Sequence, residues 1–320
     1  MRITIVPVWD AALDLGKALP VDLGHGFRVE DMSGVLGSTD LSVLSRYAAP
    51  EQQRRITEAG ICFTHEYVDR ADHGPESAHS LRLCTFVLGH LRFLVPNRST
   101  ANLMVQGTLD AGRLDVFRFS HETGSLILED AELSCSDITE SHLDTLKSWM
   151  PWIVRFETEW RELFPLFISL HFSEKAYAEE DHRIRNLLRV MALEALFATE
   201  SAFGKKALLP RVPVFVGNET NLFDQYRSDW RGSLGVFQLG NVIADVCDLR
   251  NKIAHGDAIP KSWLEADFRD GLNYKLCYAD ALREAATSML SLSWKKIISE
   301  GLQDTFAQKA KMEAYFKAKP

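Results

Sequence analysis

The sequence predicts a chain in two parts, an α+β region over residues 1–135 followed by an all-α helical region over residues 136–320. Its 320 residues are enough for two domains of ordinary size. Hydrophobic residues make up 46% of the chain and charged residues 25%, the composition of a globular protein with a substantial core. The pattern changes near residue 136: short segments broken by Gly, Pro and Ser precede it, and long stretches with helical periodicity follow.

The first region is expected to contain short strands and helices. Ile3–Val8 is a run of mostly β-branched residues, which favours a strand. Ser77–Val95 has apolar residues at helical spacing and stops before Pro96. The tripeptide Glu122-Thr123-Gly124 is typical of a hairpin turn. The expected elements are strands over Ile3–Val8, Leu114–Phe119 and Ser125–Leu128 and helices over Pro50–Ala59 and Ser77–Val95.

The second region is expected to be a series of long helices. Ser136 and Asp137 are good N-caps, and Pro151 favours the end of the first helix. Pro165 predicts a bend in the second helix. The expected helices cover Ser136–Met150, Ile153–Ser173, Glu180–Glu200, Phe237–His255 and Asn273–Glu300, with a long loop over Gly204–Gly235 and a charged helix or tail at the end.

Charge and cysteine content argue against several classes of protein. The net charge of −8 gives no overall positive field for nucleic acid or an anionic membrane, although it is compatible with a local basic site. The five cysteines are scattered and form no CxxC pair, which favours free thiols over disulfides or a zinc site. The start of the chain lacks the apolar core of a signal peptide, and no run reaches about 18 apolar residues. We therefore expect a soluble, cytoplasmic protein with no membrane span.

Phosphate-binding and catalytic motifs of the common enzyme classes are absent. The sequence has no GxGxxG, no Walker-type loop, no GxSxG and no HExxH, and its histidines show no metal-ligand spacing. No cofactor and no metal are expected.

The segment from Asp248 to Asp257 is the most suggestive for chemistry. Arg250, Asn251 and His255 lie in the last turn and a half of an expected helix that Gly256 closes. A permanently charged guanidinium beside an imidazole that can exchange a proton near neutral pH suits phosphodiester cleavage without a metal. Asn251 and His255 are four residues apart and share a helix face, whereas Arg250 and His255 are about 140° apart around the axis.

A purely structural interpretation of this segment is equally open. Basic residues near a helix C-terminus are favoured by the helix dipole, and glycine is common at the next position. The spacing of Arg250 and His255 alone does not decide between the two interpretations.

The sequence Arg250-Asn251-Lys252-Ile253-Ala254-His255-Gly256 resembles the Arg-x4-His motif of HEPN domains, which are helical bundles found in prokaryotic defence systems and RNA-processing enzymes. The polar Asn251 matches the residue that usually follows the arginine. Residues 183–200, with Ala192-Leu193-Glu194-Ala195-Leu196, are similar to a helix of the Apea-like branch. The resemblance covers about residues 140–300, with the helices in the same order.

This resemblance implies a metal-independent endoribonuclease acting on RNA as a homodimer. His255 would be the general acid or base, Arg250 would stabilise charge on the phosphoryl oxygens, and Asn251 would orient the imidazole or bind the phosphate. Cleavage would leave a 2′,3′-cyclic phosphate, and two motifs facing each other across a dimer would supply acid and base. The resemblance also implies a defence or toxin-like role, with residues 1–135 contacting an activating or inhibiting partner.

Further residues are candidates for supporting roles. Glu194 is a carboxylate in an apolar stretch, which either pairs with Arg250 in the site or forms a structural contact between helices. A basic run in the loop and one lysine of the motif are candidate contacts for RNA phosphates, the alternative being ordinary solvated charges. Nearby aromatic residues either stack on bases or pack in the core. The basic candidates are Lys205, Lys206, Arg211 and Lys252, and the aromatic ones are Phe215, Phe223, Tyr226 and Trp230.

The main alternative is a HEPN-like dimerisation or interaction module without catalysis. It predicts that a buried salt bridge holds Arg250 and that His255 is covered. The enzyme predicts both His255 side chains in an open, electropositive cleft at a two-fold axis.

Overall fold

A computed structural model describes residues 1–8, 13–14, 19–37, 46, 48–69, 74–95, 103–111, 113–121, 137–179, 181–222, 237–264, 268–269 and 275–319. Its contacts divide the chain into two compact units. Unit 1 holds the described residues up to Thr158, and unit 2 holds those from Glu159 onward.

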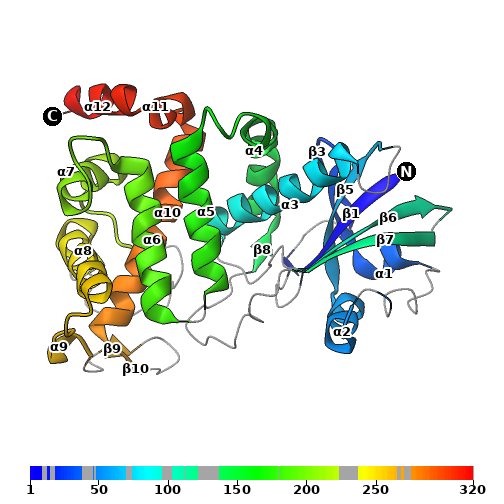
Figure 1. Ribbon diagram of the computed structural model, residues 1–320, viewed down its shortest axis with the longest axis horizontal. Coiled ribbons are helices and arrows are strands. Elements are labelled where there is room, and N and C mark those ends of the chain that lie inside the picture. The colour runs from blue at the N-terminus through cyan, green and yellow to red at the C-terminus, as the bar shows by residue number, and fades with distance from the viewer. Residues whose placement is uncertain are drawn as a thin grey trace. The chain divides into compact units, whose positions relative to one another are not determined.

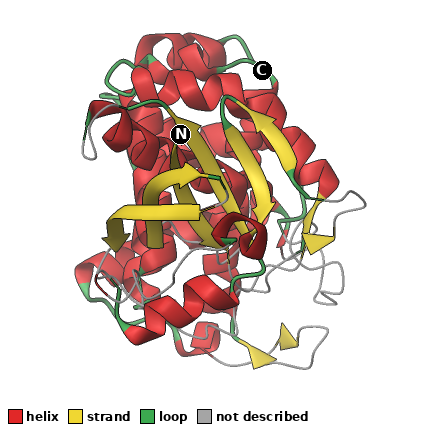
Figure 2. Ribbon diagram, turned by 90° about the vertical axis from the view of Figure 1, so that its right-hand side faces the viewer, coloured by secondary structure: helices red, strands yellow, loops and turns green. Residues whose placement is uncertain are grey.

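Unit 1 is built on a six-stranded antiparallel sheet with the order β3-β4-β5-β1-β6-β7. The first strand of the chain lies inside the sheet, between β5 and β6, so that Arg2 is opposite Tyr67 on one side and Thr108 on the other. Figure 2 shows these strands in yellow, side by side. The strands are β1 (Arg2–Val8), β3 (Val21–Gly24), β4 (Phe27–Asp31), β5 (Ile61–Tyr67), β6 (Leu103–Asp110) and β7 (Arg113–His121).

Both faces of β1 are buried, which explains its nearly continuous apolar sequence. Ile3 and Ile5 belong to an apolar core that also includes residues of α1 (Met32–Leu36) and α2 (Pro50–Glu58). Thr4 points to the opposite face, where its hydroxyl lies 2.7 Å from that of Ser80 on α3 (Pro75–Leu94). The predicted strand Ile3–Val8 and the predicted helices near Pro50–Ala59 and Ser77–Val95 are therefore confirmed.

A chain of buried hydrogen bonds ties α3 to the sheet. Ser80 Oγ lies 2.7 Å from His65 Nδ1, and Gln106 Nε2 donates to Thr4 Oγ1 at 2.9 Å. These four side chains are at most 6% exposed. Because each polar group has a partner inside the fold, their burial is compatible with a stable core.

A fourth helix, α4 (Glu140–Thr158), belongs to unit 1, although the sequence predicted a boundary at residues 135 and 136. It packs on α3 and β3, and its buried Glu157 accepts a hydrogen bond from Arg82 Nε of α3 at 2.7 Å. His79 of α3 also contacts the Glu157 carboxylate. The division therefore lies after Thr158, because tertiary contacts to α3 place α4 with the sheet. A short parallel pair, β2 (Leu13–Asp14) and β8 (Ile138–Thr139), precedes it.

The two prolines of this region have roles different from those predicted. α4 continues through Pro151, because Met150, Trp152 and Ile153 are buried beside it and their packing offsets the lost hydrogen bond. Pro165 bends no helix and instead lies in the first turn of α5 (Phe164–Ala178), where proline is well tolerated.

Unit 2 consists mainly of helices around α10 (Tyr278–Ser299), which packs on α6, α7 and α8 (Figure 1). Trp294 of α10 is fully buried and donates to Ser169 Oγ of α5 at 3.1 Å. The remaining elements are α6 (His182–Phe197), α7 (Lys205–Val216), α8 (Leu239–His255), α9 (Lys261–Leu264), α11 (Gln303–Ala307), α12 (Lys309–Lys317) and the pair β9 (Phe268–Arg269) and β10 (Lys275–Leu276). None of the helices that can be described is both long and apolar enough to cross a membrane.

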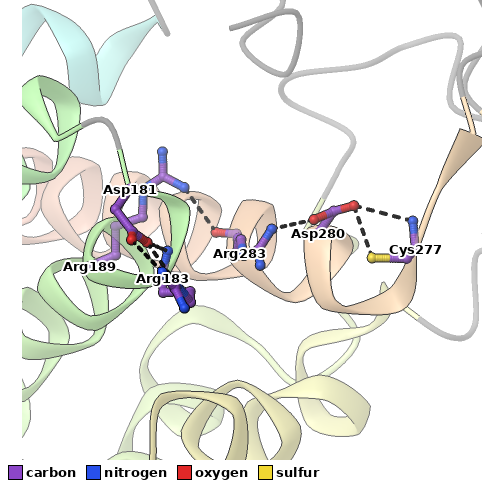
Figure 3. A network of polar contacts seen from close by, with 6 residues as sticks. All are labelled: Asp181, Arg183, Arg189, Cys277, Asp280 and Arg283. Atoms are coloured by element: carbon purple, nitrogen blue, oxygen red, sulfur yellow. Dashed lines mark hydrogen bonds and ion pairs between the residues drawn. The ribbon is translucent and has the colours of Figure 1, made fainter. Parts of the chain in front are cut away.

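A polar contact links the middle of α6 to the first half of α10, as Figure 3 shows. Arg189 Nη1 donates to the carbonyl of Arg283 at 3.5 Å, and the Arg283 guanidinium pairs with Asp280. Asp280 Oδ2 in turn accepts from Cys277 Sγ at 3.0 Å. The contact of Arg189 joins the two helices, and the other two hold the side chains at the start of α10 in place.

The mixed α and β content predicted from the sequence is confirmed, with further local differences. Residues 205–216 form α7, whereas a loop was predicted over Gly204–Gly235. Strands β3, β4, β5 and β6 of the sheet were missed. The predicted strand Leu114–Phe119 lies within β7, but its hairpin partner is β6, and the predicted partner Ser125–Leu128 lies outside the described residues.

Candidate functional site

The site predicted from the sequence lies at the C-terminal end of α8. Val242, Val246 and Leu249 are fully buried and fix this helix in unit 2. Gly256 adopts a left-handed conformation, with φ 71° and ψ 20°, and ends the helix as predicted. The Gly256 amide donates to the Ile253 carbonyl at 3.3 Å, and the Asp257 amide donates to the Lys252 carbonyl at 2.8 Å. This Schellman pair of hydrogen bonds sets the backbone on both sides of His255.

Arg250 is held by two polar side chains. Its Nη2 lies 3.2 Å from Glu194 Oε2 of α6, and its Nη1 donates to Asn251 Oδ1 at 3.0 Å. The side chains of Arg250 and Glu194 are only 25% and 19% exposed. The structure therefore brings together Arg250, Asn251 and Glu194, three of the residues predicted for the site.

Burial gives this ion pair an unusual electrostatic setting. Burial raises the pKa of Glu194, and the positive charge of Arg250 opposes that rise. Burial also raises the pKa of the neighbouring Cys247 thiol to about 12, so this cysteine stays protonated and unreactive at neutral pH. Within the described part of the chain, Arg250 Nε is buried without a hydrogen-bond partner. The guanidinium therefore has donor capacity that Glu194 and Asn251 do not use.

His255 is placed differently from Arg250. It is exposed, at the last residue of α8, and no described residue forms a hydrogen bond or ion pair with its ring. The helical repeat places His255 about 140° from Arg250, so the guanidinium lies between helices and the imidazole faces outward. One copy of the chain thus presents the two groups on different sides of α8.

The structure adds an ion pair that the sequence did not suggest. Lys205 Nζ, at the start of α7, lies 2.8 Å from both carboxylate oxygens of Asp248 on α8. Tyr278 Oη of α10 donates to Asp245 Oδ2 at 2.9 Å, one helical turn before Asp248. Asp248 opens the motif segment, but its partner is 43 residues away, and no local pattern links the two.

The four basic residues predicted to bind RNA do not form one group. Lys206 is exposed and Lys252 is half-buried, and neither forms an ion pair with a described residue. Lys205 is paired with Asp248. Arg211 lies elsewhere, where it donates to the carbonyl of Phe197 and to Thr199 Oγ1 and lies 4.0 Å from Glu313.

Of the four aromatic candidates, one is accounted for by packing and three lie outside the described residues. Phe215 is fully buried against Phe197 and Phe306, so it belongs to the core and does not stack on bases. Phe223, Tyr226 and Trp230 lie outside the described residues. Among the residues that the structure describes, no three His, Cys, Asp or Glu side chains form a group able to hold a metal ion.

The geometry therefore provides a fixed guanidinium and a free imidazole at one helix end. Arg250 can bind an anionic oxygen, and His255 can exchange a proton with a molecule approaching from outside. Comparisons of the chain with models of protein families, with curated proteins and with solved structures find no match.

Proposed function

We propose that the protein is a cytoplasmic, metal-independent endoribonuclease of the HEPN type, with an Apea-like helical domain after an α+β region. The observation that carries the proposal is the exposed imidazole of His255 at a capped helix end, in the same last turns of α8 as a guanidinium that Glu194 and Asn251 hold. A free imidazole and a positioned guanidinium are what cleavage of a phosphodiester requires when no metal takes part.

The reaction is an attack of a ribose 2′-oxygen on the adjacent phosphorus. A new bond forms between the 2′-oxygen and phosphorus, and the bond between phosphorus and the 5′-oxygen breaks. One imidazole takes the 2′-hydroxyl proton, and another gives a proton to the leaving 5′-oxygen. The products are a 2′,3′-cyclic phosphate and a 5′-hydroxyl, so DNA, which lacks the 2′-hydroxyl, is no substrate.

A second copy of the chain completes this site. In one copy His255 faces outward and Arg250 faces inward, so the two side chains cannot act on the same phosphate. The C-terminal ends of α8 from two copies therefore meet across a two-fold axis. His255 of one copy is then the base and His255 of the other is the acid, with the Arg250 groups binding the phosphoryl oxygens. A defence role follows only from the resemblance, in which an activating or inhibiting partner binds the N-terminal region.

A second candidate function is a dimerisation module without catalysis. The partly buried ion pair of Arg250 and Glu194 favours it, because a structural contact between α6 and α8 is sufficient reason for both residues. The exposure of His255 favours the enzyme.

Incubation of the purified protein with mixed RNA in EDTA distinguishes the two. We expect the wild-type protein to cut RNA and leave 2′,3′-cyclic ends, and His255→Ala to abolish cutting. His171→Ala, which removes an exposed histidine of α5, is the matched control and should keep full activity. Cutting by His255→Ala excludes the proposed site, and the absence of cutting by all three proteins favours the dimerisation module.

A further inference from the structure

A pocket of about 450 Å³ lies between α7 and α12 in unit 2, away from the Arg250 ion pair. Pockets of this size fit small organic ligands. Its wall combines three kinds of group, which are positive charges, one carboxylate and an apolar surface. The lining includes Ser201, Arg211, Val214, Glu313, Lys317 and Lys319.

The positive charges of the pocket outnumber the negative one. Lys317 is exposed and forms no salt bridge with a described residue, and Lys319 Nζ lies 4.4 Å from the centre of the Tyr315 ring. Glu313 lies 4.0 Å from Arg211 and also interacts electrostatically with Lys317, so a single carboxylate faces three basic side chains. On a chain with a net charge of −8, such a local surplus favours an anionic ligand.

Glu313 is a fixed acceptor in the same pocket. Ser201 Oγ donates to Glu313 Oε1 at 3.1 Å, and hydrogen bonds from Thr199 and Ser201 lower the pKa of this carboxyl. Its side chain is 31% exposed, so an ionised oxygen remains available to a ligand. A carboxylate only accepts hydrogen bonds, and among the bases guanine offers two adjacent donors, at N1 and N2.

The apolar part of the wall suits a flat ring. Val214 is 42% exposed, and the Arg211 guanidinium carbon lies 5.9 Å from the centre of the Phe316 ring. Aliphatic and aromatic surfaces of this kind bind the faces of bases, and a guanidinium plane does the same.

The segment from Thr199 to Lys205 connects this pocket to the Arg250 site. Ser201 lines the pocket, and a Cβ added to Gly204 would lie 3.6 Å from Glu194 Oε1. Lys205 contacts Asp248 on α8. Phe203, between these positions, is 74% exposed. The pocket and the Arg250 ion pair therefore lie at the two ends of one seven-residue segment.

We propose that the pocket between α7 and α12 binds a guanine nucleotide, with the phosphate at Lys317 and Lys319 and the base edge at Glu313. The ligand is either a free mononucleotide or a guanosine of the RNA strand. The RNA source rests on the proposed ribonuclease function, whereas the affinity for a mononucleotide does not.

Calorimetric titration of the full chain with guanosine 5′-monophosphate tests the pocket, with uridine 5′-monophosphate and inorganic phosphate as comparison probes. We expect saturable binding of the guanine nucleotide and weaker binding of the other two. The double variant Lys317→Ala/Lys319→Ala should weaken binding roughly three- to thirtyfold, the combined effect of two exposed charge pairs. Lys311→Ala, which removes an exposed lysine of the same helix outside the pocket, should leave affinity unchanged.

The absence of saturable binding, or unchanged affinity in the double variant, overturns the proposal. Equal binding of inorganic phosphate overturns the base contact, and equal binding of the uridine nucleotide overturns the assignment of guanine to Glu313. Val214→Glu, at an exposed position of the wall, should block the pocket without affecting folding.

A single-stranded RNA with one guanosine, added to the nucleotide-loaded His255→Ala variant, identifies the source. Displacement of the nucleotide supports an RNA subsite, and its absence assigns the pocket to free mononucleotides. If wild-type protein binds the nucleotide but cuts no RNA, the proposed ribonuclease function is contradicted and the proposed nucleotide site is still supported.

Discussion

Glu194 Oε2 lies 3.2 Å from Arg250 Nη2, although 56 positions separate the two residues in the chain. The contact joins α6 to α8 at the turn that carries the predicted site. Because both side chains are less than one-third exposed, the pair contributes more than a surface ion pair and also fixes the direction of the guanidinium.

A double-mutant cycle with Glu194→Gln and Arg250→Met should give a coupling energy of about 1–2 kcal/mol in urea unfolding. The exposed pair of Asp181 and Arg183, whose side chains are 35% and 67% exposed, is the control and should couple by less than about 0.5 kcal/mol. Equal coupling in the two cycles would show that partial burial adds nothing to the Glu194 contact.

Asp248→Asn should release Lys205 for contact with RNA. The Lys205 ammonium is 2.8 Å from both Asp248 oxygens, so it is already paired and is not available to bind a phosphate. We expect tighter binding of single-stranded RNA and a log–log salt dependence steeper by about 0.7, the value for one added phosphate contact. Fluorescence anisotropy at several salt concentrations measures both. Asp144→Asn, at an exposed position of unit 1, changes the net charge equally and should leave the slope as it is.

Gly256→Ala should destabilise the end of α8 by about 1–2 kcal/mol, because alanine is strained at a φ of 71°. Gly256→Asn should lose less, since asparagine tolerates the left-handed region better. Hydrogen exchange of the Gly256 and Asp257 amides reports the change directly, because both amides donate in the helix cap. If the alanine variant leaves their protection unchanged, the cap does not hold His255 in place.

Unit 1 should lose stability in acid. Burial lowers the pKa of His65 and of His90 to about 4, from an ordinary value of 6.5. The free energy of unfolding has its full value above pH 6.5, where both rings are neutral in the folded and in the unfolded chain. It decreases as the pH falls toward 4, because only the unfolded chain then binds protons at these rings. Each ring accounts for at most about 3 kcal/mol.

Urea unfolding between pH 4 and 8 measures this loss. His90→Gln should flatten the decline in the unfolding free energy, because the buried titrating ring is gone. His171→Gln, at an exposed ring, should retain the wild-type slope. A decline that is identical in all three proteins would show that His90 does not contribute and would leave the acid sensitivity to His65 and the carboxyl groups.

The end of α8 was predictable because its determinants are local. The apolar stripe and the basic last turn lie within the 17 residues of α8, and Gly256 follows directly. Lys205–Val216 was missed because Pro210 and Pro213 favour a loop, whereas Ala207, Leu208 and Val212 are fully buried and hold the segment as a helix.

Long-range contacts account for the other differences. The placement of α4 in unit 1 depends on the contact between Glu157 and Arg82, which are 75 positions apart. The pair of Lys205 and Asp248 likewise has no local signal. Glu194 was a candidate partner of Arg250 because a carboxylate in an apolar helix needs a partner, and only the structure shows which one it has.

The position of β1 inside its sheet has a consequence for synthesis. Residues 2–8 leave the ribosome before their neighbours in the sheet, which are residues 61–67 and 103–110. Strand β1 therefore stays unpaired while about a hundred further residues are added, which takes roughly 5–20 s at the usual rate of translation. During this interval the apolar side chains of β1, which the finished sheet buries, are exposed to the solvent and to chaperones.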